Sequence, residues 1–246
     1  MAAPRNSLKA ALAAQAVTKG LWLNLASDAA TEIAGHSGAD WCLIDGEHTA
    51  FDPTRITAQA RVLAGTPAAP VVRLPAAEPW MLGQVLDAGV QSIMVPRVDT
   101  AEAAAAMVAA CRYPPRGTRG VGPAVSRAGG YGRLSMYTDT AEAELCLIVQ
   151  AETARALDNL EAMAAVDGID CVFIGPSDLA ANTGLSGAAL DHILGDAITR
   201  ITATGKVAGI FASAETAPHY AALGARMIAV GSEAMILATA LKGALA

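Results

Sequence analysis

Short runs of apolar residues recur along the chain, and longer stretches with helical periodicity separate them. We expect eight buried strands, at residues 20–25, 40–45, 70–75, 91–95, 145–149, 171–174, 207–211 and 227–230. Expected helices cover 28–38 (capped by Asp28), a stretch beginning near 52–53, then 79–88, 101–111, 153–165, 190–204, 216–223 and the C-terminal residues. Short buried strands that alternate with helices are typical of parallel pairing through right-handed crossovers. The pattern predicts a single-domain α/β protein, a (β/α)₈ TIM barrel over residues 1–246.

Two features bear on this fold prediction. No Gly-x-Gly-x-x-Gly motif follows the first strand, which argues against an open dinucleotide-binding sheet. Residues 112–144 are rich in Gly, Pro and Arg and show no sustained period. A long irregular segment inside a compact domain is usually functional, so we expect a functional loop here.

Composition narrows the classes of partner. The chain is 53% hydrophobic and 16% charged, which favours a large core over disorder. Its formal net charge is −6 without a basic stripe, so no nucleic-acid partner is expected. No apolar run is long enough to span a membrane, and a short leading helix is a better prediction than a signal peptide. Four cysteines without a Cys-x-x-Cys pair indicate a reduced, cytoplasmic protein.

Polar residues gather at the carboxyl ends of the expected strands, where barrel enzymes build their sites. The second strand ends in Asp45, followed by Glu47 and His48, and the third ends near Arg73. An aspartate three positions before a histidine can fix the tautomer of the imidazole and raise its basicity, as a general base requires. Arg73 would stabilise a developing enolate. The alternatives are a solvated loop histidine and a salt bridge at the edge of the core.

The fifth and sixth strands bring further acids to the same end. Glu152 and Asp178, with Gln150 nearby, are the oxygen ligands that suit Mg²⁺, Mn²⁺ or a similar ion. Capping of the following helices is the alternative role for both acids. In the turn formed by Gly175, Pro176, Ser177 and Asp178, free backbone N–H groups would hold a substrate carboxylate, although an ordinary turn has the same composition.

The lysines exclude one chemistry. An aldolase that forms a Schiff base needs a lysine inside the barrel mouth. None of the four lysines lies at the carboxyl end of an expected strand; they are Lys9, Lys19, Lys206 and Lys242. A serine hydrolase is also not expected, because the Gly-x-Ser-x-Gly elbow is missing.

These segments together resemble the HpcH/HpaI family of metal-dependent class II pyruvate aldolases, whose best-known member is 4-hydroxy-2-oxoheptanedioate aldolase. The resemblance follows nearly the whole chain in order. It is carried by Gly20-Leu21-Trp22, Leu43-Ile44-Asp45-Gly46-Glu47-His48, Val71-Val72-Arg73, Arg112-Tyr113-Pro114-Pro115, Arg119-Gly120-Val121-Gly122, Gln150-Ala151-Glu152-Thr153 and Phe173-Ile174-Gly175-Pro176-Ser177-Asp178-Leu179.

The resemblance implies a role for each matching residue. Glu152 and Asp178 would bind a divalent cation such as Mg²⁺, Mn²⁺ or Co²⁺, with Gln150 beside them. His48, oriented by Asp45, would act as acid and base through a water. The implied roles of the others are substrate contacts: Arg73 at the keto oxygen, Trp22 at the pyruvyl methyl, and the backbone of Gly175, Ser177 and Asp178, in the turn that includes Pro176, at the carboxylate.

The implied reaction is the reversible cleavage of a 4-hydroxy-2-oxo acid to pyruvate and an aldehyde, as in aromatic compound catabolism. The activated water takes the proton of the C4 hydroxyl, the C3–C4 bond breaks, and pyruvate enolate remains. Succinic semialdehyde, sugar-derived aldehydes and small hydroxyaldehydes all stay open. The resemblance also implies a homohexamer, a trimer of dimers with the last helix exchanged, in which Asp87 approaches a neighbour's aldehyde. Arg97 has no expected role.

Two other functions fit the same residues. A citryl- or malyl-thioester lyase would share the scaffold, but it needs a coenzyme A groove with more basic residues at its rim. A catalytically silent sensor would bind a 2-oxo acid through the same groups without turnover. The shorter chain and the pairing of Asp45 with His48 favour the aldolase.

Overall fold

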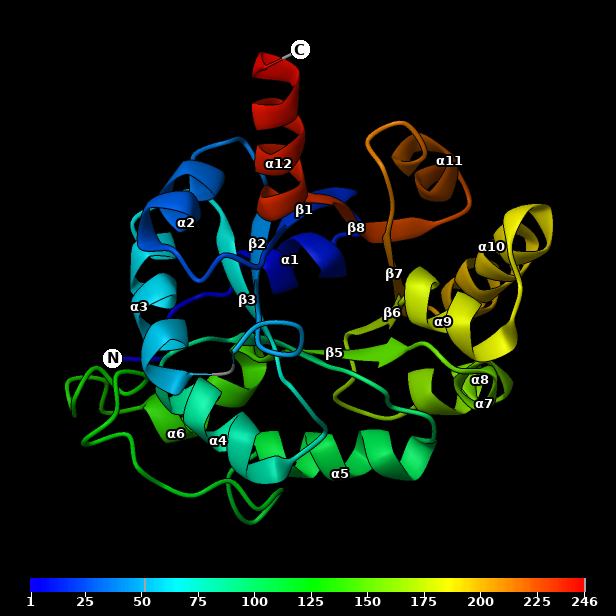
Figure 1. Cartoon of the computed structure of the whole chain (residues 1–246). Helices are drawn as coiled ribbons and strands as arrows, with labels where there is room; N and C mark the ends of the chain where they lie inside the picture. The colour runs from blue at the N-terminus through cyan, green and yellow to red at the C-terminus, as the bar shows by residue number, and fades with distance from the viewer. Residues whose placement is uncertain (51, 246) are drawn as a thin grey trace.

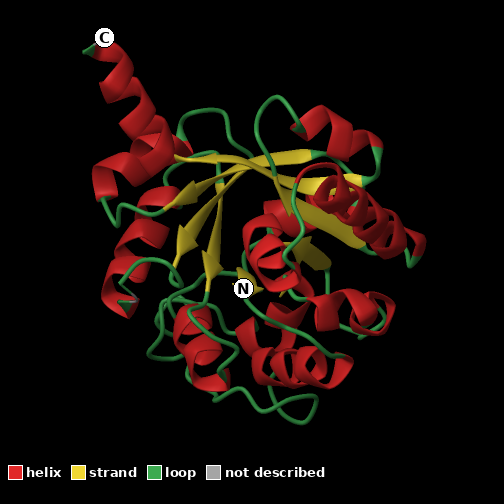
Figure 2. Ribbon diagram, turned by 45° about the vertical axis from the view of Figure 1, so that its right-hand side comes forward, coloured by secondary structure: helices red, strands yellow, loops and turns green. Residues whose placement is uncertain are grey.

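The computed structural model describes residues 1–50 and 52–245, and within them eight parallel strands form one closed barrel. Each strand pairs with its neighbours in chain order, and β8 closes the barrel against β1 (Figures 1 and 2). The single-domain (β/α)₈ prediction is therefore confirmed. The strands are β1 (Thr18–Leu23), β2 (Trp41–Asp45), β3 (Ala69–Arg73), β4 (Ser92–Val95), β5 (Cys146–Ala151), β6 (Cys171–Ile174), β7 (Val207–Phe211) and β8 (Ala225–Ser232).

The strands are buried on both faces, which is why they read as continuous apolar runs. Alternate residues of β2 show the division: Trp41 and Leu43 belong to the cluster inside the barrel, whereas Cys42 and Ile44 pack outward against the helices. Gly20 makes room for this interior, because a Cβ at that position would lie 2.1 Å from the Trp41 ring. Strand burial thus fixes which side chains can reach the barrel mouth.

A ring of helices covers the outside of the barrel. The helices are α2 (Asp28–Gly35), α3 (Pro53–Leu63), α4 (Pro79–Asp87), α5 (Ala101–Cys111), α7 (Ala154–Asp158), α8 (Leu160–Ala164), α9 (Pro176–Thr183), α10 (Gly187–Ala203), α11 (Ala217–Ala222) and α12 (Glu233–Ala244). The expected leading helix is present as α1 (Ser7–Ala13), and its Leu8 and Leu12 belong to the inner cluster. In neither described range is a helix long and apolar enough to cross a membrane.

Several boundaries differ from the sequence-based expectation. Helix α9 begins directly after β6, between the expected strand at 171–174 and the expected helix at 190–204, because Gly175 and Pro176 start it and Gly184 ends it with a φ of 71°. The expected helix over 153–165 is divided at Asn159, whose side-chain amide donates to the carbonyls of Asp99 and Arg155. Ser27, not Asp28, accepts the capping hydrogen bond of α2, which ends at Gly35 rather than near 38.

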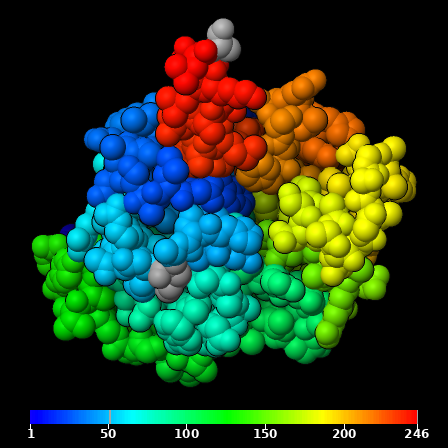
Figure 3. Space-filling model, viewed as in Figure 1, coloured from blue at the N-terminus to red at the C-terminus, as the bar shows by residue number. Residues whose placement is uncertain are grey.

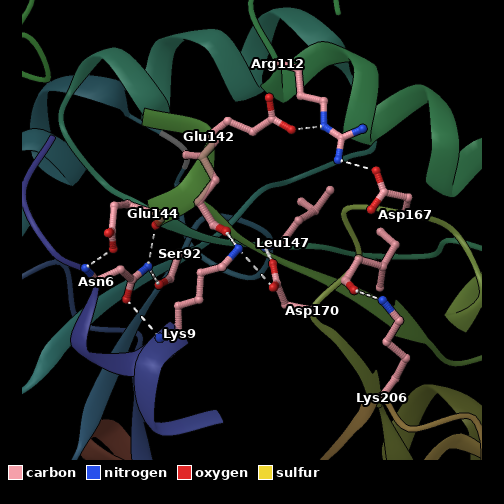
Figure 4. A network of polar contacts seen from close by, with 12 residues as sticks. Asn6, Lys9, Ser92, Arg112, Glu142, Glu144, Leu147, Asp167, Asp170 and Lys206 are labelled. Atoms are coloured by element: carbon pink, nitrogen blue, oxygen red, sulfur yellow. Dashed lines mark hydrogen bonds and ion pairs between the residues drawn. The ribbon is translucent and has the colours of Figure 1, made fainter. Parts of the chain in front are cut away.

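The irregular segment that follows α5 ends in more structure than expected. Residues 137–144 form α6 (Tyr137–Thr140) and a 3₁₀ helix, η1 (Ala141–Glu144). Figure 4 shows how charged side chains fasten this segment to the amino end of the barrel: Arg112 contacts Glu142 at 2.7 Å and Asp167 at 2.8 Å, and Lys9 contacts Asp170 at 3.0 Å. Arg112 and Lys9 therefore both have acidic partners, whereas Lys206 donates to the carbonyl of Ile169.

Candidate active site

The ends of β2 and β3 form a buried ion pair at the mouth of the barrel. Asp45 and Arg73 are the last residues of these strands and are register partners. Arg73 donates from Nε to Asp45 Oδ1 at 2.9 Å and from Nη2 to Oδ2 at 2.8 Å. Its remaining nitrogen, Nη1, lies 2.7 Å from Glu47 Oε2. Both Asp45 and Arg73 are buried, so this pairing fixes the guanidinium in one orientation.

Asp45 does not orient the imidazole of His48 in the way we expected. Its carboxylate accepts from Arg73, from the Asn24 side-chain amide at 2.8 Å, and from the backbone N–H groups of Glu47 at 3.0 Å and His48 at 3.4 Å. These donors occupy both oxygens of the Asp45 carboxylate. His48 is exposed beyond the end of β2, and its position is set through its backbone rather than its ring.

Glu152, just after β5, is buried and only half satisfied. Its Oε1 accepts the backbone N–H of Arg97 at 2.8 Å, while Oε2 has no hydrogen-bond partner within the described residues. Burial, and then the neighbouring charges of Glu47 and Asp178, raise the pKa of Glu152 to about 7. Burial also raises the pKa of Glu47, and the charges of Asp45 and Asp178 act in the same direction. Three acids therefore share this pocket.

The turn that begins α9 lies directly against Glu152. A Cβ at Gly175 would come within 2.8 Å of both Glu152 Oε2 and Gln150 Nε2, so only glycine fits without displacing them. Pro176 is the first helical residue and Asp178 lies in the first turn. The first N–H groups of a helix lack partners within the helix, so this turn offers donors beside the acids.

These residues fit a divalent cation. Glu152 Oε2 and Gln150 Oε1 are buried oxygens without hydrogen-bond partners among the described residues, and burial, together with the charges of Glu47 and Asp178, raises the pKa of Glu152. No group of three or more His, Cys, Asp or Glu residues in the described ranges is arranged to hold an ion alone. Glu152 and Asp178 would thus need oxygens from water or substrate to complete the shell of a hard cation.

Trp22 borders the same site from β1. Its ring lies 5.6 Å from Phe173 and 5.3 Å from Phe211, and the Arg73 guanidinium carbon is 5.4 Å from its centroid. This aromatic wall is buried beside a cation, which suits a small apolar group next to a polarised oxygen. The structure therefore brings Trp22, Asp45, Arg73 and the acid pocket together at the carboxyl ends of the strands.

Sequence reasoning assigned no role to several residues of this site. Glu47 was visible at the end of β2, but its contact with Arg73 was not foreseen. Glu233, 209 positions after Asn24, accepts the backbone N–H groups of Asn24 at 2.6 Å and Leu25 at 2.7 Å, and Ser232 donates to Asn24 Oδ1 at 2.8 Å. This network supports the amide that Asn24 gives to Asp45. Only the closure of β8 on β1 brings it together.

Asp87 lies away from this site in its own chain. It is the last residue of α4, just before the chain re-enters the barrel at the amino end of β4. Its Oδ1 is 2.8 Å from Nη2 of the buried Arg119. An acid at the amino end of the barrel does not serve a site at the carboxyl end of the same barrel, so any contact with substrate would require a neighbouring subunit.

The closed parallel barrel, with acids and a guanidinium at its mouth, has the architecture of (β/α)₈ barrel enzymes, whose active sites lie at the carboxyl ends of the strands. The family model described as HpcH/HpaI aldolase/citrate lyase matches residues 18–240, and the chain belongs to this family. It is 48% identical to a 4-hydroxy-2-oxovalerate aldolase of Novosphingobium aromaticivorans, over 97% of this chain and 92% of that protein. It is 45% identical to a hydroxypyruvate/pyruvate aldolase of Agrobacterium fabrum, over 98% and 93%. A solved HpcH/HpaI family structure from Burkholderia cenocepacia superposes with a TM-score of 0.93, at 38% identity over 98% of both chains.

Proposed function

We propose that this protein is a class II pyruvate aldolase that reversibly cleaves a 4-hydroxy-2-oxo acid to pyruvate and an aldehyde. One observation carries the proposal: a guanidinium locked by two carboxylates stands in the same mouth as a buried, half-satisfied Glu152. Such a site stabilises an oxyanion on one side and binds a cation on the other. Relatives that are named aldolases support the same reaction class.

Each side chain has a task in this scheme. A divalent cation held by Glu152 and Asp178 would supply the Lewis acidity that enolate formation needs. The free N–H groups at the start of α9 bind the carboxylate of the 2-oxo acid, and Trp22 packs against its methyl side. Arg73 donates to the keto oxygen and stabilises the enolate charge as the C3–C4 bond breaks. His48 takes the C4 hydroxyl proton through a water and returns it in the reverse direction.

We also propose a small aldehyde partner. The relatives are named for hydroxypyruvate, pyruvate and 4-hydroxy-2-oxovalerate. Cleavage of a five-carbon 4-hydroxy-2-oxo acid between C3 and C4 leaves pyruvate and a two-carbon aldehyde. This shifts the proposal from a 4-hydroxy-2-oxoheptanedioate, which would release succinic semialdehyde, toward shorter substrates.

A panel of aldehydes tests the reaction and the cation together. Pyruvate or hydroxypyruvate is incubated with acetaldehyde, glycolaldehyde or succinic semialdehyde, after chelation and after adding back Mg²⁺, Mn²⁺ or Co²⁺. We expect product that depends on the cation, with the two-carbon aldehydes preferred. Full activity in excess chelator would contradict the scheme. Product only from an acetyl-thioester and glyoxylate would establish the thioester lyase instead.

His48→Ala separates an aldolase from a silent 2-oxo acid sensor. We expect the variant to bind pyruvate as before while cleavage slows by about 10²–10⁴-fold, the usual contribution of an acid–base group. Calorimetry with pyruvate gives the binding, and aldehyde release gives the rate. Unchanged turnover would remove the assigned role, and a wild type that binds but never turns over would be the sensor.

The proposed assembly is a hexamer in which partners exchange α12. This helix projects from the barrel in Figures 1 and 3, and none of its residues is buried in the single chain. Met235, Ile236 and Leu241 are exposed on it, beside a cavity of about 750 Å³ that α10, α11 and β8 also line. We expect Ile236→Glu to lower the molar mass measured by light scattering, whereas Lys242→Glu, at the charged position in the last turn of α12, serves as the control.

A further inference from the structure

A second group of cations lies at the opposite end of the barrel from the proposed aldolase site. A cavity of about 640 Å³ opens where the N-terminal segment, the end of α3 and residues 127–134 meet. Figure 1 shows these three parts of the chain next to one another. Four arginines line the cavity: Arg5, Arg61, Arg127 and Arg133. Among the described residues that line it there is no Asp or Glu. We call the four arginines the arginine cluster.

Within the described residues the arginine cluster has no acidic partner, which distinguishes it from most of the other arginines. The sequence holds thirteen arginines, and six of them form ion pairs within the described residues: Arg55, Arg73, Arg112, Arg116, Arg119 and Arg200. Four of the other seven are the cluster. In a chain with a net charge of −6, acids were available to neutralise them. Cations gathered without a counter-charge repel one another, so this cluster would bind an anion favourably.

Local contacts hold the cluster toward the cavity. Arg127 is half-buried and donates to the Ala88 carbonyl at 2.9 Å. Burial, followed by the charge of Arg61, lowers the pKa of Arg127, so the two guanidinium groups are close enough to repel. Tyr131 lies between them and Arg133: its hydroxyl is 3.4 Å from Arg61 Nη2, and its ring centroid is 6.0 Å from the Arg133 guanidinium carbon.

The backbone at Tyr131 supports a binding role. Tyr131 has a φ of 55°, between Gly130 at 61° and Gly132 at 84°. A tyrosine rarely adopts this left-handed conformation, and residues held in it tend to cluster at ligand clamps and active sites. The loop is thus held in a costly shape that places Tyr131 among the arginines.

We propose that the arginine cluster binds a small molecule carrying more than one phosphate group. The planar fork of a guanidinium matches phosphate oxygens with two parallel hydrogen bonds. Several such forks around one cavity suit two phosphates better than a single carboxylate. The cavity volume lies within the range of small-molecule sites, roughly 300–1,000 Å³. Within one chain this site lies at the opposite end of the barrel from the aldolase site, and it does not depend on the proposed function.

Binding of fructose 1,6-bisphosphate, used as a probe of this chemistry, tests the proposal. Calorimetry on the full chain with its divalent cation, at constant ionic strength, is expected to show saturable binding with a Kd below about 1 mM. Unphosphorylated fructose, the neutral counterpart, is expected not to bind. Arg61→Gln and Arg127→Gln should each weaken binding by about tenfold or more, because each removes charge-assisted hydrogen bonds. Arg155→Gln is the matched control, since Arg155 is exposed and lies outside the cavity.

Three outcomes would overturn the proposal. The first is no saturable binding to the wild type, or binding that matched chloride abolishes. The second is equal weakening in Arg155→Gln and Arg61→Gln, which would show only a general effect of charge. The third is a loss of molar mass in Arg61→Gln or Arg127→Gln without the probe, since the cluster would then serve a contact between subunits. Circular dichroism of each variant establishes that it is folded.

Discussion

Two carboxylates in the same barrel mouth are equally buried and have opposite surroundings. Asp45 and Glu152 are 3% and 2% exposed. Asp45 accepts two hydrogen bonds from Arg73, one from Asn24 and two from backbone N–H groups. Glu152 accepts one, from Arg97, and its second oxygen has no hydrogen-bond partner among the described residues, although the charges of Glu47 and Asp178 act on it. Burial is therefore not what distinguishes a structural acid from a working one.

This difference shows which acid organises the site and which acid has an oxygen free to bind a cation. A buried carboxylate with every oxygen satisfied stabilises the fold and holds its partner in place. A buried carboxylate with a free oxygen costs stability unless a positive charge arrives. We infer that Asp45 fixes Arg73, whereas Glu152 is kept poor in partners so that it can take a cation. Substitutions of the two residues should therefore both lower activity but differ in their effect on stability.

Glu152→Gln should have the largest effect on activity and a small effect on stability. The amide keeps the shape and accepts from Arg97, but it removes the charge that would bind the cation. We expect aldol cleavage to fall by more than the roughly 10²–10³-fold that loss of a single oxyanion donor costs. The free energy of unfolding without metal should stay the same or rise, because a buried uncompensated charge is removed. A stable variant that retains cation-dependent turnover would contradict the role of Glu152.

Asp45→Asn should lower both stability and activity. The carboxylate that accepts two hydrogen bonds from Arg73 is lost and the buried guanidinium keeps only Glu47 as an acidic partner among the described residues, so we expect a loss of about 3 kcal/mol in the free energy of unfolding. Cleavage should also slow, because Arg73 is no longer fixed. Urea denaturation without metal, run beside Glu152→Gln, measures the contrast. Equal stability of the two variants would end the distinction between the acids.

The same two acids show how far sequence alone can be used. The alternation of apolar runs with helical stretches was sufficient to predict the barrel, and the polar strand ends placed Asp45, Arg73 and Glu152 at one mouth. The sequence did not show which neighbour each acid contacts. Asp45 was expected to hold the imidazole of His48, three positions away. The register of β2 with β3 gives it Arg73 instead, 28 positions away.

The partner of Glu152 was unpredictable for a different reason. Arg97 supplies its backbone N–H from a left-handed conformation with a φ of 53°, which a side-chain pattern does not reveal. The support of Asn24 by Glu233 depends on barrel closure between the two ends of the chain. Contacts made by backbone groups, or across the whole sequence, follow from tertiary geometry. Spacing along one strand carries no information about them.

The pH dependence of stability should reveal the raised pKa of Glu152. The pKa of Glu152 is raised to about 7 in the folded chain without metal. Between about pH 4.5 and 7 the folded state therefore holds a proton that the unfolded state has lost. Stability from this group is full at low pH and decreases as the pH rises to 7, by at most about 3 kcal/mol. The free energy of unfolding of metal-free wild type and Glu152→Gln, measured at each pH, gives the contribution of Glu152 as the difference between them. A difference that does not change with pH would contradict the prediction.

Arg97→Gly should have the smallest effect and shows which part of Arg97 serves Glu152. Glycine adopts a positive φ without strain, so the backbone N–H stays on Glu152 while the strain is removed, for a gain of about 1 kcal/mol or less. Arg97→Ala is the control, because it removes the guanidinium but retains the strained conformation. If the backbone alone matters, both variants should keep kcat/KM within about threefold, equivalent to about 0.6 kcal/mol. A loss of tenfold or more in both variants would show instead that the exposed guanidinium of Arg97 contacts the substrate. Arg97 would then contribute its side chain to the reaction as well as the backbone N–H that Glu152 accepts.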